Sequence, residues 1–194
     1  VSLPKLKKQI IFYSEGKSYW PNFEDIILRL LEHYEVSICY LSSDKNDPGL
    51  KLKHNHYSSF EIDEGYLRNW IFENIDCNVV VMTMPDLDNF QIKKSINQVH
   101  YVYIQHSLVS LHMSYRKGAF DNFDTIFCAG PHHLKEIRAQ EQFYNLKKKN
   151  LICHGYPRLD KIIKDKENFA FKEKRTDSDT INILIAPSWG TSGL

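Results

Sequence analysis

Short apolar runs recur along the chain, and most are rich in the β-branched and aromatic residues that favour strands. The runs lie at 9–13, 36–41, 79–83, 99–104, 125–129 and 151–153, with a weaker candidate at 55–62. Most of them are apolar throughout and do not alternate with polar residues. That pattern is typical of strands covered on both faces in a parallel sheet.

Segments with a helical spacing of apolar residues separate these runs. Pro21 opens the first segment, Asp63 is expected to cap the second, and Pro131 opens a third that extends to Tyr144. The apolar faces comprise Ile26, Ile27, Leu30 and Leu31 in the first helix and Leu67, Trp70 and Ile71 in the second. Weaker helical signals occur at 87–96, within 108–120 and at 159–163. The histidine pair 132–133, at the start of the third helix, is expected to be exposed.

Strands that alternate with helices predict an α/β fold with a doubly wound, Rossmann-like parallel sheet and right-handed crossovers. We assign residues 1–163 to this domain. Residues 164–180 are dominated by charge and are expected to form a linker or a solvated helix. Residues 181–186 form another apolar run, so 181–194 is expected to begin a second domain that is cut short. The alternative is a strand added last to the first domain.

Composition narrows the function classes. Hydrophobic residues make up 42% and charged residues 25% of the chain, which is typical of a soluble globular protein. A formal net charge of +1 argues against a nucleic-acid partner, because no large basic excess is present to neutralise phosphates. The four cysteines form no CxxC pair, so we expect reduced thiols and no metal site.

No apolar run approaches the length of a membrane span, and the short basic start does not have the pattern of a signal peptide. We therefore expect a cytoplasmic protein. Lysine clusters at 5–8 and 147–149 permit peripheral contact with the inner face of the cell membrane. Such clusters are more often simply solvated.

Candidate chemistry begins where the apolar run 99–104 ends. His106 and Ser107 follow that run, and in parallel sheets ligands bind beyond the carboxyl ends of the strands. The ordinary pKa of histidine lies close to neutrality, which suits a general base. The alternative, a histidine held by hydrogen bonds within the core, has equal weight on position alone.

Two further loops carry groups suited to an anionic ligand. In the loop after the first strand, Gly16 permits close backbone approach, and Lys17 and Ser18 offer donors to phosphate oxygens. This loop is not a nucleotide-hydrolysing P-loop, because the upstream glycine that such a loop needs would stand at position 11, which is Ile. On its own, such a segment is more often an ordinary β–α turn.

The segment 155–160 reads GYPRLD, in which Arg158 can clamp a phosphate or pair with Asp160 at a helix start. The segment 186–190 reads APSWG and brings a hydroxyl and an indole to a tight turn. It can equally be a sharp end to a strand.

Taken in this order, four segments resemble the CDP-glycerol glycerophosphotransferase family, which primes and polymerises teichoic acids and related capsule polymers. The segments are Phe12–Tyr19, Tyr103–Ser107, Gly155–Asp160 and Ile185–Trp189. The chain departs from the family pattern at Ser107, where the family has glycine, at the following 108–110, and at Leu159, where it has asparagine. The resemblance implies the GT-B fold, with an acceptor-binding domain followed by a nucleotide-donor domain.

The resemblance also implies a mechanism. His106 would deprotonate an acceptor hydroxyl, which attacks the β-phosphorus of CDP-glycerol or a related CDP-alcohol and releases CMP. The residues implied in binding are Gly16, Lys17, Ser18, Ser107 and Arg158 for the acceptor and its phosphate, and Pro187, Ser188 and Trp189 on the donor side. The partners would be the nucleotide donor and a polyol-phosphate or lipid-linked acceptor, with no cofactor.

On this interpretation, activity is expected to need the donor domain. Two other functions remain open. One is a GT-B glycosyltransferase that uses a nucleotide sugar, and the other is a non-catalytic acceptor-binding module.

Overall fold

The chain folds around a seven-stranded sheet in which every neighbouring pair of strands is parallel. The computed structural model describes residues 9–90, 92–168, 183 and 185. The strands are β1 (Ile10–Ser14), β2 (Ile38–Ser42), β3 (Tyr57–Glu61), β4 (Val79–Met82), β5 (His100–Ile104), β6 (Thr125–Cys128) and β7 (Asn150–Cys153). The predicted α/β fold with a doubly wound parallel sheet is confirmed.

The strand order is β3-β2-β1-β4-β5-β6-β7. The chain starts in the middle of the sheet at β1, builds outward to β3, and then continues on the other side of β1 with β4. The order therefore reverses between β1 and β4, and in open parallel sheets ligands bind beyond the strand ends at such a point. The loops that follow β1, β4 and β5 all reach this edge.

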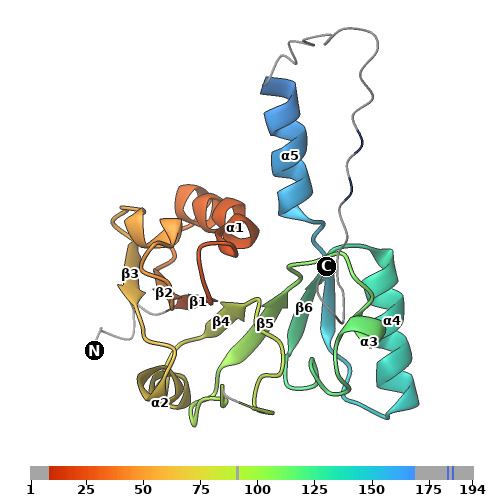
Figure 1. Cartoon of the computed structure of the whole chain (residues 1–194). Helices are drawn as coiled ribbons and strands as arrows, with labels where there is room; N and C mark the ends of the chain where they lie inside the picture. The colour runs from red at the N-terminus through yellow and green to blue at the C-terminus, as the bar shows by residue number, and fades with distance from the viewer. Residues whose placement is uncertain (1–8, 91, 169–182, 184, 186–194) are drawn as a thin grey trace, which may run out of the picture.

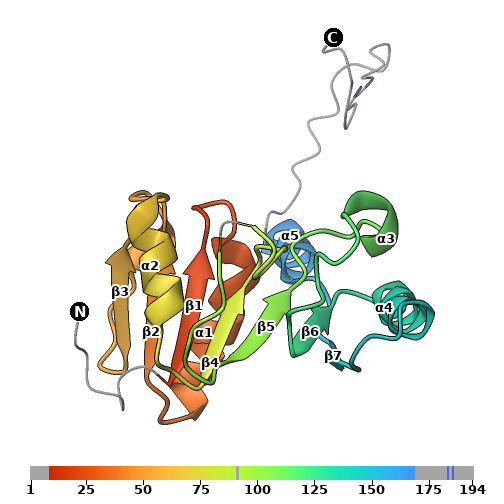
Figure 2. The ribbon, with the colours of Figure 1, turned by 90° about the horizontal axis from the view of Figure 1, so that it is seen from below.

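Helices cover both faces of the sheet (Figures 1 and 2). They are α1 (Trp20–His33), α2 (Tyr66–Asn74), α3 (Leu111–Ser114), α4 (Pro131–Phe143) and α5 (Pro157–Asn168), with a 3-10 helix η2 (Pro48–Lys51). One apolar cluster joins the sheet to α2, α3 and α4. The other joins the opposite face to α1, and α5 packs beside α1.

Strand β5 confirms the predicted burial on both faces. Tyr101 and Tyr103 belong to the cluster under α2, α3 and α4. Val102 and Ile104 belong to the cluster under α1. The strand ends at Ile104, so the candidate histidine lies in the loop that follows it.

A buried carboxylate organises the loop after β2. The Asp47 side chain is fully buried, and it accepts hydrogen bonds from the Tyr40 hydroxyl at 3.0 Å, the Ser42 hydroxyl at 2.8 Å and the Gly49 N–H at 2.9 Å. The Tyr57 hydroxyl donates to the Gly49 carbonyl at 2.7 Å. These bonds satisfy the buried oxygens of the Asp47 side chain, as polar groups away from water require.

The helix suggested at 87–96 is wrong. The described residues of this segment form turns, and Asp88 has a φ of 65° while Asp86, just before the segment, has a φ of 63°. Both lie in the left-handed region, which a right-handed helix cannot contain. The Asp88 N–H donates instead to the Ile92 carbonyl at 2.7 Å.

The expected cap of α2 is wrong, and its expected apolar face is correct only at Ile71. The N-cap is Gly65, with no side-chain cap. Ile71 packs against the core and the helix buries Arg68 and Phe72, whereas Leu67 and Trp70 are each 52% exposed. Phe72 makes an edge-to-face contact with Tyr13 of β1, at 4.9 Å between ring centroids, so a central aromatic ring determines which side of the helix faces inward.

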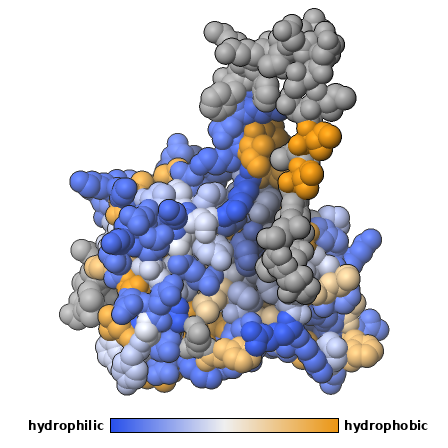
Figure 3. All heavy atoms as spheres, in the orientation of Figure 1, coloured by the Kyte–Doolittle hydropathy of each residue, from blue (hydrophilic) through white to orange (hydrophobic). Residues whose placement is uncertain are grey.

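Helix α5 is longer than the short helix predicted at 159–163, and it takes in the first five residues of the predicted linker. Its exposed face carries Leu159, Ile162 and Ile163, at 43%, 62% and 53% exposure, and Figure 3 shows exposed apolar side chains gathered on α5. The strand and loop expected at 181–190 lie outside the described residues except for Ile183 and Ile185.

Candidate functional site

Three loops that are distant in sequence meet at the carboxyl edge of the sheet. They are the loop after β1 (15–19), the loop after β5 (105–110) and the loop after β7 (154–156). Strand β7 lies at the far edge of the sheet, but the chain then returns across this edge to place α5 against α1. Gly155 enables the turn, because its φ of +84° lies in the left-handed region.

Side chains fasten these loops to one another. The Tyr156 hydroxyl donates to the His106 carbonyl at 2.9 Å. The Arg158 guanidinium donates to the carbonyl of Ser18. The Tyr19 ring lies edge-to-face with the imidazole of His106, at 5.6 Å between centroids.

The His106 ring is half-buried in a cage of tyrosines. Its Nδ1 lies 3.1 Å from the Tyr103 hydroxyl, and its Nε2 lies 3.5 Å from the Tyr115 hydroxyl. The Tyr103 contact is the shorter one and Tyr103 itself is fully buried, so Nδ1 is the fixed nitrogen. Nε2 has the longer of the two tyrosine contacts, which favours it as the nitrogen that a ligand can approach.

Burial lowers the pKa of His106 below its ordinary value, and the positive charge of Arg158 lowers it further. A hydrogen bond to the Thr83 backbone opposes this shift without reversing it. The imidazole is therefore neutral at neutral pH, which is the form that accepts a proton.

The first loop presents its polar groups on the surface. Lys17 and Ser18 are exposed, and Gly16 is half-buried. The Lys17 N–H donates to the Asp44 carboxylate at 3.1 Å. Asp44, which follows β2, was not a predicted site residue, and its negative charge accompanies Lys17 at this edge.

Arg158 does not make the alternative contact that the sequence suggested, a pairing with Asp160. Among the described residues it forms no ion pair with Asp160, and it donates to the first loop instead. Its Nε is buried and has no hydrogen-bond partner within the described ranges. The guanidinium therefore keeps one buried donor without a partner.

Ser107 lies in the same wall of the site. It is half-buried, and its Oγ is 3.3 Å from the Tyr115 hydroxyl. Tyr115 thus contacts both members of the predicted His-Ser pair. The donor-side residues Pro187, Ser188 and Trp189 lie outside the described residues.

Sequence reasoning missed most of the surroundings of His106. Tyr19, Tyr103, Tyr115 and Tyr156 all contact this residue, and only their frequency near the candidate loops was visible in the sequence. The neighbouring Gln105 is 1% exposed. Neither polar atom of its side chain has a hydrogen-bond partner in the part of the chain that the structure describes.

His133 corrects a sequence expectation, because it is fully buried while its neighbour His132 is exposed. Its Nδ1 accepts from the Ala129 N–H at 3.2 Å, and its Nε2 lies 2.9 Å from the Val109 carbonyl. The Nδ1 bond needs the neutral ring, because a protonated Nδ1 has no lone pair to accept with. His133 therefore joins the start of α4 to the loop that carries His106.

We expect the chain to lose stability as the pH falls from 7 to 5. Desolvation lowers the pKa of His106, His133 and His154 in the folded state, whereas in the unfolded state the pKa of each returns to about 6.5. Between the lowered value and about 6.5 the unfolded chain binds more protons, so the free energy of unfolding decreases with acidification. Urea denaturation at several pH values measures this slope.

The variant His133→Gln tests the contribution of His133 to this pH dependence. Its amide accepts and donates hydrogen bonds but does not ionise between pH 7 and pH 5. Its slope between pH 7 and pH 5 should be shallower than that of the wild type. His33→Gln, at an exposed site on α1, is the matched control and should keep the wild-type slope. Equal slopes for His133→Gln and the wild type would contradict this account.

Within residues 9–90 and 92–168, no three His, Cys, Asp or Glu side chains come together in a way that could hold a metal ion. Over the same described ranges, none of the helices has the length and apolarity needed to cross a bilayer.

The sequence of the chain is similar to that of a known protein family. The family model described as CDP-Glycerol:Poly(glycerophosphate) glycerophosphotransferase matches residues 1–193. No curated protein matches the chain. No solved structure matches it either.

Proposed function

The chain belongs to the CDP-glycerol:poly(glycerophosphate) glycerophosphotransferase family, and from this premise we propose that it supplies the acceptor side of a polyol-phosphate transfer. The donor would be CDP-glycerol or a related CDP-alcohol, and the acceptor a hydroxyl of a cell-wall or capsule polymer. One observation supports this most strongly. Three loops that resemble family motifs converge on a single neutral histidine at the point where the strand order reverses.

The proposed reaction begins with a proton transfer. The acceptor hydroxyl would give its proton to Nε2 of His106, the ring nitrogen with the longer tyrosine contact. The resulting oxygen attacks the β-phosphorus of the CDP-alcohol and forms a new P–O bond. The bond from that phosphorus to the bridging oxygen breaks, and CMP leaves with the bonding electrons. Assistance of this kind contributes about 10²–10⁴ in rate.

Cationic and neutral donors around His106 would bind the acceptor and its phosphate. Arg158 lies close enough to His106 to affect its pKa, and its guanidinium would donate to a phosphate oxygen. Lys17, Ser18 and the backbone at Gly16 would add donors from the first loop, and Ser107 a hydroxyl. A guanidinium suits this task because its fork of donors matches the geometry of phosphate.

The donor side of the proposal rests on the resemblance. Pro187, Ser188 and Trp189 would approach the nucleotide, as the family motif that they resemble implies. In this arrangement the 181–194 segment would belong to a nucleotide-binding domain.

We expect release of CMP from CDP-glycerol when a polyol-phosphate acceptor is present. The assay would use the 194-residue chain and any longer natural form that contains it, with CMP separated from CDP-glycerol by anion-exchange chromatography. CDP-ribitol and UDP-glucose are the matched alternative donors. CMP release that depends on the acceptor would support the proposal.

Two outcomes would contradict it. Turnover of UDP-glucose without turnover of either CDP-alcohol would favour a GT-B glycosyltransferase. Acceptor binding without turnover of any donor, in every form of the protein, would favour a non-catalytic binding module.

A further inference from the structure

Three hydroxyl groups extend from the proposed base to the edge of the site. The Tyr103 hydroxyl lies 3.1 Å from Nδ1 of His106. The Tyr115 hydroxyl lies 3.5 Å from Nε2 of the same ring and 3.3 Å from Oγ of Ser107. Tyr103 is fully buried, whereas Tyr115 and Ser107 are half-buried. We call Tyr103, Tyr115 and Ser107 the hydroxyl chain, which leads from the core to a group that a ligand can reach.

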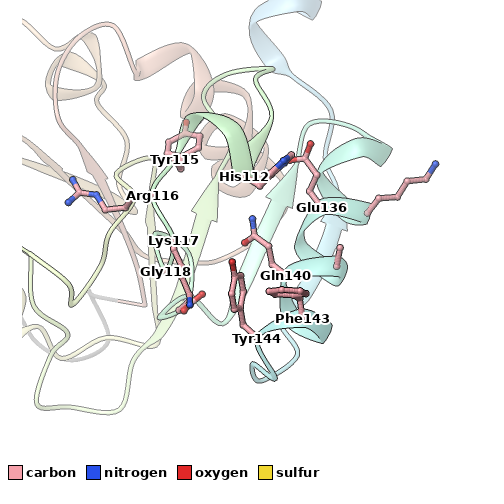
Figure 4. A pocket seen from close by; sticks show the side chains of 12 residues that line it. His112, Tyr115, Arg116, Lys117, Gly118, Glu136, Gln140, Phe143 and Tyr144 are labelled. Carbon is pink, nitrogen blue, oxygen red and sulfur yellow. The ribbon is translucent and has the colours of Figure 1, made fainter.

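Aromatic packing holds the two tyrosines of the hydroxyl chain in place. The Tyr103 ring makes edge-to-face contacts with Phe120 and Phe123, at 4.9 and 5.3 Å between ring centroids. The Tyr115 ring contacts Phe120 in the same way at 5.0 Å, and it also lines a pocket between the segment 112–121 and α4 (Figure 4). Because these contacts belong to the rings, a phenylalanine at either position would keep them.

The number of protons limits how these groups can pair. A neutral imidazole carries one N–H, and each tyrosine carries one O–H. An N–H donor typically lies about 2.7–3.2 Å from its oxygen acceptor, and hydroxyl donors typically lie closer to theirs. The 3.1 Å between Nδ1 of His106 and the Tyr103 hydroxyl is therefore a length expected when Nδ1 donates.

The proton of Tyr103 has a separate acceptor. Burial holds the pKa of Tyr103 well above its usual value, and Tyr115 raises this pKa further through its charge and a hydrogen bond. A hydrogen bond raises the pKa of a phenol when the phenol donates it, because the bond then stabilises the protonated form. Tyr103 therefore donates to Tyr115. Its oxygen is left to accept from Nδ1 of His106.

Other groups that face the imidazole do not compete for this role. Burial lowers the pKa of His106, while a hydrogen bond to the Thr83 backbone opposes this shift and the charge of Arg158 adds to it. The Thr83 carbonyl has no proton to give, so it is a second acceptor for the single N–H of the neutral ring. Tyr19 meets the imidazole through its ring, edge-to-face at 5.6 Å.

We propose that Tyr103 is a positioning residue whose oxygen accepts the Nδ1 proton of His106 and leaves the lone pair of the neutral ring on Nε2. This inference rests on the proposed function, in which Nε2 takes the proton of the acceptor hydroxyl. The hydrogen bonds then run in one direction, from Nδ1–H through Tyr103 and Tyr115 to Ser107. The Ser107 hydroxyl keeps its own proton, which it can donate to an oxygen of the acceptor.

This arrangement prepares the ring for the proposed proton transfer. The O–H bond of the acceptor breaks, an N–H bond forms at Nε2, and the ring becomes an imidazolium that still donates from Nδ1 to Tyr103. No bond of the hydroxyl chain has to break in this step. Donors and acceptors that are in place before the reaction avoid the cost of reorganisation.

Nitrogen NMR of the chain labelled with ¹⁵N-histidine tests the proposal without any substrate. In a neutral imidazole, the nitrogen that carries the proton and the nitrogen that carries the lone pair have well-separated shifts, so spectra recorded above the pKa of the ring identify its tautomer. The signals of His106 are those lost in His106→Gln. We expect a protonated Nδ1 and an unprotonated Nε2. An Nε2–H tautomer in the wild type would overturn the proposal.

Tyr103→Phe removes the acceptor and keeps the ring. The Nε2–H tautomer of His106, which can donate to Tyr115, should then become populated. The kcat of CMP release should fall about two- to tenfold, the usual effect of one neutral hydrogen bond, with KM unchanged because Tyr103 is buried away from the acceptor. The pKa of His106 should also fall, since an acceptor at Nδ1 stabilises the imidazolium. A rise would mean that Tyr103 donates to Nδ1 and would overturn the proposal.

Two further variants separate this role from a general loss of stability. Tyr101→Phe removes another buried hydroxyl of β5, one that accepts from the Ser95 N–H at 2.8 Å, and should leave the tautomer and kcat unchanged. Tyr115→Phe removes the acceptor of the Tyr103 proton, which can then turn to Nδ1, so the Nε2–H tautomer should appear here as well. Equal changes in Tyr101→Phe and Tyr103→Phe would contradict a specific role of Tyr103.

The positioning role and the proposed function fail in different ways. An Nε2–H tautomer in a protein that releases CMP in the presence of the acceptor would overturn the role of Tyr103 alone. An Nδ1–H tautomer without CMP release in any form of the protein would overturn the proposed function alone.

Discussion

Replacement of His106 with glutamine is expected to lower the rate of CMP release by about 10²–10⁴-fold, the usual contribution of a general base. Glutamine fills a similar space and can keep a hydrogen bond to the Tyr103 hydroxyl, which contacts Nδ1 in the wild type. It has no nitrogen that accepts a proton near neutral pH. The rate is measured by CMP release at saturating CDP-glycerol, and folding by the urea midpoint, which should stay close to the wild-type value.

The pH dependence gives an independent check. Because burial lowers the pKa of His106, the wild-type rate should rise with pH below about 6.5 and reach a plateau near neutrality. This rise of the rate with pH should be absent in His106→Gln. The control variant His33→Gln changes the last residue of α1, away from the candidate site. It should keep both the wild-type rate and the rise of the rate with pH. Near-normal turnover by His106→Gln would refute the assignment of the base.

Gly49→Ala is expected to be among the most destabilising single substitutions in the chain. A Cβ at this position would lie 2.4 Å from Cε1 of Tyr40 and 2.7 Å from Cζ3 of Trp20. Both rings are buried, and the Tyr40 hydroxyl is held by Asp47, so neither ring can move aside easily. Overpacking of this kind costs about 1–3 kcal/mol or more. A loss of about 3 kcal/mol would lower the Tm by roughly 6–12 °C.

Calorimetry or thermal circular dichroism measures this change. Gly65→Ala is the matched control, because the nearest atom to its added Cβ is an oxygen of Asp63 at 3.9 Å. It should lower the Tm by much less. An unchanged Tm for Gly49→Ala would mean that the loop after β2 adapts more freely than its hydrogen bonds indicate.

Sequence patterns predicted the sheet well, because a strand that is buried on both faces consists almost entirely of apolar residues. All seven strands were expected close to their observed positions, and the apolar run at 99–104 indicated burial on both faces. The face of α2 was not predictable in this way. Phe72 is buried there because it meets Tyr13, and a contact between residues so far apart leaves no local periodicity. The turns at Asp86 and Asp88 were missed for a related reason, since aspartate occurs both in helices and in left-handed turns.

The candidate site was predictable in its motifs and not in its geometry. The loops at Gly16, His106 and Arg158 were identified from residue type and position after strands. The tyrosine cage and the carboxylate of Asp44 beside Lys17 depend on how loops fold over one another. Arg158 illustrates this most clearly, because its nearest charged neighbour in sequence, Asp160, is not its partner.

The link between Arg158 and Ser18 spans 140 positions, and this has a consequence for biosynthesis. On a ribosome, β1 and β2 can pair soon after they emerge, but the loop between β1 and α1 has to wait for almost the whole domain to be translated before Arg158 can secure it. A nascent chain stalled before Pro157 would contain all seven described strands but would have a loosely held first loop. Limited proteolysis of such stalled chains should therefore cut near Lys17, and protection there should appear only after α5 has been synthesised.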